Sequence, residues 1–240
     1  MSNDVAAQRR HPEEGGYARG EETRARIIAA ALRIFGDHGY DQASTRQIAA
    51  SAGVNPPALQ YYFGGKEGLH RACAQHIIER VSGVLDPAYE RAVRAARAGD
   101  RGEAIAAQCA LLESMVDGLM AAGADSWCRF IARGKADGAG PAMAMIHEHI
   151  GKRLREATVR LVAAVTGQQA RSEVTRLRAG TLLAQVTNIY ANREYLLPAM
   201  GWTEFDARVL GLIKSVVVEN TRLLLTGWPK AEHGRSRAKG

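Results

Sequence analysis

Cysteine is scarce in this chain of 240 residues: the three copies are Cys73, Cys109 and Cys128. Their odd number argues against a disulfide framework, and their spacing lacks the C-x-x-C pairs typical of zinc sites. Long apolar runs are also missing, since none approaches the roughly 18–20 residues that a membrane-spanning helix needs. Residues 1–20 are polar and do not resemble a secretory signal peptide. We therefore expect a cytoplasmic protein with no membrane partner.

A charge excess at the N-terminal end is missing too. The net charge is +7, yet residues 1–70 hold eight Lys/Arg and eight Asp/Glu, so this segment is balanced. A positive net charge permits a nucleic-acid partner but does not identify one. Any claim of nucleic-acid binding must therefore come from a motif.

Alternating strand patterns are absent as well, and apolar residues recur at spacings of three and four, which predicts an all-α fold. The first helix is expected over 23–38, with Gly39 as its stop. After a short second and third helix, further helices are expected at about 66–85, 88–98, 102–121, 125–136, 141–166, 170–197 and 204–226. Pro87 should kink the chain or restart the helix between the first two of these.

The second and third helices carry strong local signals. Ser44 and Gln47 have the spacing of a capping box, which starts the second helix and lets it run to about 52–53. Asn55 is a good N-cap and Pro56 suits the first helical position, so a third helix of about seven residues should run to Phe63.

The spacing of three residues indicates how these two helices pack. Ala49 is small where the helices approach, Gly53 allows the tight turn, and Leu59 lies in the small core between them. This arrangement predicts a helix-turn-helix whose second helix can enter the DNA major groove. A helical hairpin of an ordinary bundle is the alternative. The polar side chains of Gln60 and Lys66 favour DNA.

Three segments together resemble the N-terminal domain of the tetracycline-repressor (TetR) family: TRARIIAAALRIFGDHGY at 23–40, STRQIAASAGV at 44–54 and LQYYFGGKEGL at 59–69. The segments GGKEGLHRACAQHI at 64–77 and ANREYLLP at 191–198 are similar to the CecR-like subgroup. The resemblance implies an all-helical homodimer with a three-helix DNA-binding head and a larger helical domain. It also implies a repressor that binds a palindromic operator and is released by a small-molecule effector.

The resemblance further implies which side chains contact DNA. They are Thr45, Arg46, Asn55, Pro57, Ala58, Gln60, Tyr61, Tyr62 and Lys66. Thr45 has capping as an alternative role, and Tyr62 has packing. Many relatives have tyrosine in place of Gln60; because glutamine can bond both N6 and N7 of adenine, the family's base preference cannot be transferred.

Composition predicts a flexible arm at 1–20 and a basic flexible tail at 228–240. Between them, the resemblance implies the DNA-binding domain (21–68) and the effector-binding and dimerisation domain (69–227). An effector pocket would be lined by apolar side chains with a few polar anchors. The candidates are Met115, Leu119, Trp127, Phe130, Met143, His147, Tyr190 and Arg193. The helices at 170–197 and 204–226 should form the dimer through Leu182, Leu183, Val186, Ile189, Val209, Leu212, Ile213, Val216 and Val217.

An enzyme is the main competing class. The chain has no dinucleotide fingerprint and no Walker motif, and His147 and His149 are too close in sequence to face one metal from a helix. We expect no catalytic residues, no metal and no cofactor. Two further alternatives stay open: a helical small-molecule-binding protein without DNA affinity, and an activator.

Overall fold

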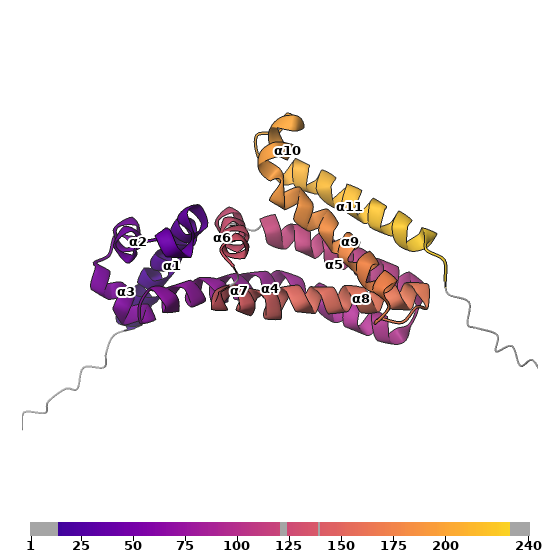
Figure 1. The fold of residues 1–240 in the computed structure, drawn as a ribbon, viewed down its shortest axis with the longest axis horizontal. Helices are drawn as coiled ribbons and strands as arrows, with labels where there is room; N and C mark the ends of the chain where they lie inside the picture. Colours follow the sequence, from indigo (N-terminus) through magenta and orange to yellow (C-terminus); the bar gives the residue numbers. More distant parts are fainter. Residues whose placement is uncertain (1–13, 121–123, 139, 231–240) are drawn as a thin grey trace, which may run out of the picture.

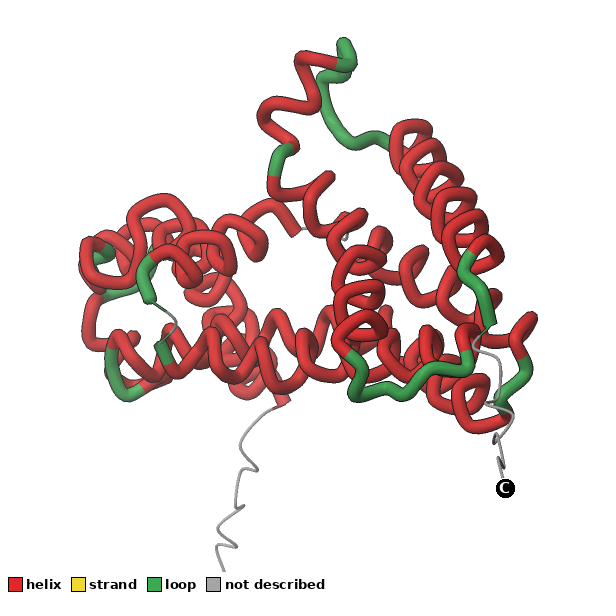
Figure 2. The backbone as a smooth tube through the Cα atoms, turned by 45° about the vertical axis from the view of Figure 1, so that its right-hand side comes forward, coloured by secondary structure: helices red, strands yellow, loops and turns green. Residues whose placement is uncertain are grey.

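The computed structural model describes residues 14–120, 124–138 and 140–230, which are helical with no strand among them (Figure 2). In chain order the elements are α1 (Glu14–Gln42), α2 (Thr45–Ala52), α3 (Pro56–Phe63), α4 (Lys66–Ala98), α5 (Arg101–Met120), α6 (Ala124–Ala136), α7 (Pro141–Ile146), the π-helical turn η1 (His147–Lys152), α8 (Arg153–Thr166), α9 (Glu173–Ala191), α10 (Arg193–Ala199) and α11 (Ala207–Gly227). The predicted all-α class is confirmed.

The molecule is elongated, with α1, α2 and α3 at one end and α5, α8, α9 and α11 at the other (Figure 1). The long helix α4 runs between the two ends and packs against α1 at its start and against α5 and α8 further along. Helix α6 packs against α1. These two helices therefore connect the small N-terminal head to the larger helical part.

The buried side chains form two hydrophobic cores. The first joins α1, α2, α3, the start of α4, α6 and α7 around Phe35, Leu59 and Phe130. The second joins the rest of α4 with α5, α8, α9 and α11 around Leu111, Leu161 and Leu182. Burial of such apolar side chains is the main favourable term in folding. The head thus shares its core with two helices of the larger part.

Helix α4 continues without interruption through Pro87, so the predicted break between 85 and 88 is wrong. Proline removes one backbone N–H and crowds the carbonyl of the residue four positions earlier, which here is Gly83. Leu85 and Ala88, on either side of the proline, are both buried in the second core. We attribute the continuity to this packing, which stabilises the helix on both sides of Pro87.

Three other boundaries differ from the prediction. Helix α1 begins at Glu14 and not at 23, so residues 14–20 of the predicted arm are helical, whereas 1–13 and 231–240 lie outside the described residues. The stretch 141–166 contains the π-helical turn η1, and the stretch 170–197 breaks at Asn192. Helix α1 is kinked at the predicted stop, where Gly39 has a non-helical conformation with φ 79°, but its bounds run on to Gln42. None of the described helices is long and apolar enough to cross a membrane.

Candidate DNA-contacting surface and effector cavity

The turn between α2 and α3 is held by local hydrogen bonds. The Ser44 side chain accepts a bond from the Arg46 backbone N–H at 3.2 Å, and the Ser44 N–H donates to Gln47 Oε1 at 3.1 Å. Gly53 adopts the left-handed conformation with φ 66°. Asn55 Oδ1 accepts a bond from the Ala58 N–H at 3.2 Å. The predicted caps and turn are therefore confirmed, and they give α3 a defined direction.

Helix α3 is attached to the head through one face. Leu59 on α3 and the α2 residues Ile48 and Ala49 are fully buried in the first core. The other face of α3 is open, with Gln60 exposed and Tyr61 84% exposed. A short helix with one face packed against the core and the opposite face exposed has the geometry needed to enter a major groove.

The predicted DNA-contacting residues are exposed to different degrees. The exposed members are Arg46, Asn55, Pro57, Gln60 and Tyr61, and the half-buried members are Thr45, Ala58, Tyr62 and Lys66. The Tyr62 ring packs against those of Tyr61 and Phe63, with centroids 5.1 and 6.2 Å away. Tyr62 therefore has a packing role in the head.

Lys66 has a partner within the protein. Its Nζ donates a hydrogen bond to the Asp41 carbonyl oxygen at 3.1 Å and lies 4.7 Å from the centre of the Tyr40 ring. The lysine thus connects the first residue of α4 to the end of α1. A phosphate contact by Lys66 would have to share or replace this bond.

Helices α3 and α4 approach each other very closely at Gly68. A Cβ atom added there would lie 1.8 Å from the Phe63 carbonyl oxygen, far inside contact distance. Any other residue at position 68 would therefore force the two helices apart. Sequence reasoning missed this position, because an unremarkable glycine near a helix start gives no signal of what lies opposite it.

A cavity of about 490 Å³ lies between α4, α5, α6, α7, η1, α8 and α9. Three of the predicted effector residues line it: Met115, Met143 and His147. Sequence reasoning missed most of the other lining residues, such as Leu85 and Lys135, which come from helices far apart in the chain. The volume is within the range of pockets that hold drug-sized ligands.

The other predicted effector residues lie elsewhere. Trp127 and Phe130 are buried in the first core, with the Phe130 ring centroid 4.8 Å from that of His70. Tyr190 and Arg193 contact the start of α6. Leu119 is on α5, but its side chain falls outside the described part of the chain. The candidates thus do not form one pocket, because apolar character alone does not distinguish a cavity wall from a filled core.

Comparisons with known proteins agree with this geometry. The profile of "Bacterial regulatory proteins, tetR family" matches residues 27–73, and that of the "HTH-type transcriptional dual regulator CecR, C-terminal domain" matches residues 107–228. The CecR protein of Shigella flexneri is 34% identical over 214 residues, which cover 87% of this chain and 94% of that protein. The chain belongs to the TetR family. The predicted family and CecR-like subgroup are confirmed.

Other relatives of this TetR-family chain match in part or in fold. The regulator BetI of Brucella canis is 36% identical over 69 residues, which cover 29% of this chain and 35% of BetI. A TetR-like regulator from Rhodococcus sp. RHA1 superposes with a TM-score of 0.60 at 23% identity, over 91% of this chain and 100% of that one. AibR, solved with isovaleryl coenzyme A and operator DNA, superposes with a TM-score of 0.56 at 18% identity, over 84% of this chain and 97% of AibR.

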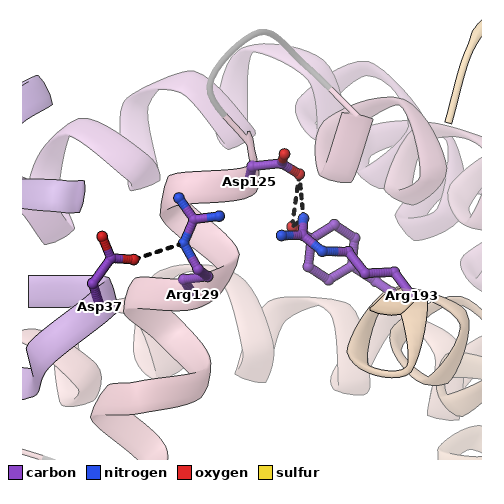
Figure 3. A network of polar contacts seen from close by, with 5 residues as sticks. Asp37, Asp125, Arg129 and Arg193 are labelled. Atoms are coloured by element: carbon purple, nitrogen blue, oxygen red, sulfur yellow. Dashed lines mark hydrogen bonds and ion pairs between the residues drawn. The ribbon is translucent and has the colours of Figure 1, made fainter. Parts of the chain in front are cut away.

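In this TetR-family chain, α6 forms ion pairs on two sides (Figure 3). Arg129 Nε lies 3.1 Å from Asp37 Oδ1 on α1, and the neighbouring Gly36 allows the two helices to approach closely. One turn earlier, Asp125 pairs with Arg193, whose side chain is only 13% exposed. The head and the α9–α10 segment are therefore both bonded to the same helix.

The predicted dimerisation residues divide into three groups by exposure. The residues buried within the protomer are Leu182, Val186, Val209, Ile213 and Val217. The half-buried ones are Leu183 and Ile189, and the exposed ones are Leu212 and Val216. Leu177 on α9 and Leu223 on α11 are also exposed, at 69% and 65%. These exposed side chains give α9 and α11 apolar surface that the protomer leaves uncovered.

The described residues contain no group of three or more His, Cys, Asp or Glu side chains arranged to hold a metal ion. The three cysteines are buried, and burial raises the pKa of each thiol, that of Cys128 to about 11. Thiols with raised pKa values are poor nucleophiles.

Proposed function

We propose that this TetR-family transcriptional regulator binds a palindromic operator as a homodimer and is released when a small molecule occupies the cavity between α4 and α9. The open face of α3 is the observation that carries the first part. With its buried face held by Leu59 and its outer face exposed, α3 has one direction in which to meet another molecule. The relatives CecR and BetI are named as transcriptional regulators, and a regulator of this kind acts in the cytoplasm, where its DNA is.

The contact residues have distinct roles in this proposal. Arg46, exposed at the start of α2, bonds phosphates, and Tyr61 and Gln60 on α3 meet base edges or sugar and phosphate atoms. Thr45, Pro57, Ala58 and Tyr62 form the surface beside them. The Asn55 side chain is already used in capping, so it serves DNA binding by fixing α3.

The homodimer follows from the uncovered apolar surface on α9 and α11. Two protomers related by a two-fold axis would bury Leu212 and Val216 and present two copies of α3. Successive major grooves on one side of B-DNA lie about 34–36 Å apart, and the operator is then an imperfect palindrome. Leu212→Glu should yield monomers in light scattering, whereas Gly83→Glu, which adds a charge at an exposed site on α4, should not.

The test of operator binding is selection of bound fragments from random DNA, followed by footprinting of the enriched sequences. We expect two inverted half-sites and a binding constant whose logarithm falls linearly with the logarithm of the salt concentration. Failure to enrich any duplex at low salt would refute DNA binding. Enrichment of a single asymmetric site would refute the symmetric dimer.

A second candidate activity is activation of transcription at some promoters. The Shigella flexneri relative that spans most of this chain is named a dual regulator, which is the observation in its favour. A reporter fused to each selected promoter would separate the two activities. Derepression of every target on deletion of the gene supports repression alone, and loss of expression at any target supports the dual activity.

A further inference from the structure

The cavity between α4 and α9 has walls of strongly uneven chemistry. Most of its surface is apolar and includes Leu85, Ile131 and Leu154. Gly118 on α5 is buried, yet a Cβ atom added to it would meet no atom of the other described residues within 4 Å outside its own helix backbone, so its missing side chain leaves open space. An apolar group of a ligand can fill this space. A ligand that occupies the cavity must therefore have an apolar body.

Only three polar side chains line the cavity among the described residues: Lys135, His147 and Thr187. The Thr187 hydroxyl donates to the Leu183 carbonyl oxygen at 3.3 Å, so its proton is already used. Lys135 on α6 is exposed and forms no ion pair with any described residue. No carboxylate of the described part of the chain lines the cavity. A cationic ligand would find no charge partner there.

Besides the Lys135 amine, the ring of His147 offers a hydrogen-bond donor. An NH2 nitrogen of Arg155 lies 3.2 Å from His147 Nε2. Because a guanidinium can only donate, Nε2 accepts this bond and the neutral ring carries its proton on Nδ1. Nδ1 faces Gly151, which also lines the cavity and has no side chain to cover it. Lys135 and His147 thus both offer hydrogen-bond donors to an occupant.

The backbone of η1 supports a binding role for this wall. His147, Ile150 and Gly151 all come from η1 and all line the cavity. Single π-helical turns inside α-helices are rare and occur frequently at functional sites, where they redirect side chains. Here the turn directs a donor, an apolar side chain and a bare backbone position toward the same space.

We propose that the effector is an organic anion with an extended apolar body, its charged group bound by Lys135 and His147 and its body packed against Leu85, Ile131 and Leu154. This inference rests on the proposed function, because it names the ligand class of the effector cavity. Two features carry it: a cavity wall that is apolar except at Lys135, His147 and Thr187, and the absence of any carboxylate among the described residues that line it. The positive charge of Lys135, with no carboxylate among the described lining residues, selects an anion over a cation.

The test is calorimetric titration of the full chain with three probes of equal length: decanoate, 1-decanol and decyltrimethylammonium, each below its critical micelle concentration. We expect decanoate to bind most tightly and the cation most weakly. In the series from hexanoate to decanoate, affinity should rise roughly fourfold per added methylene until the cavity is filled. Binding of the three probes with equal affinity, or of none of them, would overturn the proposal.

Two variants locate the bound molecule. Lys135→Gln should weaken decanoate binding by about five- to tenfold and leave decanol binding unchanged, while Lys135→Arg should restore the decanoate affinity. Gly118→Leu places a side chain in the open space and should abolish binding, whereas Gly83→Leu, at an exposed site on α4 outside the cavity lining, should not. Unchanged decanoate affinity in Lys135→Gln or in Gly118→Leu would overturn the assignment.

Affinity for selected DNA, measured on the same preparations without any probe, keeps the two proposals separable. Retained DNA binding together with failure of the probe pattern overturns the ligand class alone. Loss of DNA binding by the unmodified protein overturns the regulator function, whatever the probes do.

Discussion

Replacement of Gly68 by alanine tests how the reading helix is held against α4. Gly68 is the third residue of α4, and an added Cβ would lie 1.8 Å from the Phe63 carbonyl oxygen and 3.0 Å from its carbonyl carbon. A carbon and a carbonyl oxygen in close contact are normally about 3.3–3.6 Å apart. The end of α3 must therefore move by roughly 1.5 Å relative to the start of α4.

The expected change in the free energy of unfolding follows from two opposing effects. Alanine stabilises a helix interior by about 0.5–1 kcal/mol relative to glycine. Inserting an extra methyl group into a closely packed site costs about 1–3 kcal/mol, and this clash is with backbone, which cannot rotate away. We expect Gly68→Ala to lower the free energy of unfolding by about 1–2 kcal/mol and DNA affinity by about tenfold or more, because α3 carries the exposed Gln60 and Tyr61.

Gly83→Ala is the matched control, because position 83 lies on the same helix, is exposed, and has no atom within 4 Å of an added Cβ. It should raise the free energy of unfolding by about 0.5–1 kcal/mol and leave DNA affinity unchanged. Urea unfolding followed by circular dichroism measures the stability, and fluorescence anisotropy with the selected DNA measures the affinity. If Gly68→Ala were as stable as Gly83→Ala and bound DNA equally well, the close approach of α3 and α4 would be refuted.

Three further predictions concern the head. Gln60→Ala should relax base choice at one position per half-site, with a penalty of about 1–3 kcal/mol that repeated selection would measure; an unchanged site preference contradicts a base contact. Lys66→Ala should lower the free energy of unfolding by about 0.5–1.5 kcal/mol, because the bond to the Asp41 carbonyl is lost, and should reduce the salt slope of DNA binding by about one if the amine also meets a phosphate. Burial, with the charge of Lys66, lowers the pKa of His70 from 6.5 to about 4. Because the unfolded state then binds this proton more readily than the folded state, the free energy of unfolding should be highest above about pH 6.5 and fall toward pH 4. The decrease between pH 7 and pH 5 should be about 2 kcal/mol. This difference should shrink in His70→Gln, and an equal difference in both proteins would exclude His70 as its source.

The sequence alone determined the features that depend on a few consecutive residues. The capping box of Ser44 and Gln47, the left-handed Gly53 and the cap at Asn55 join atoms no more than four residues apart, so their residue types suffice to predict them. The resemblance of these segments to the TetR family rests on the same local signals. The head, its turn and the direction of α3 were therefore predictable.

Only the tertiary structure decided which side chains meet across helices. Met143 and Trp127 are both apolar residues buried in the first core, yet only Met143 also lines the cavity. Likewise, the passage of α4 through Pro87 depends on helices that pack beside it. The bond from Lys66 joins residues 25 positions apart. Helical periodicity tells which face of a helix is apolar, but the shape opposite that face depends on distant segments, so a filled core and an open cavity look alike in the sequence.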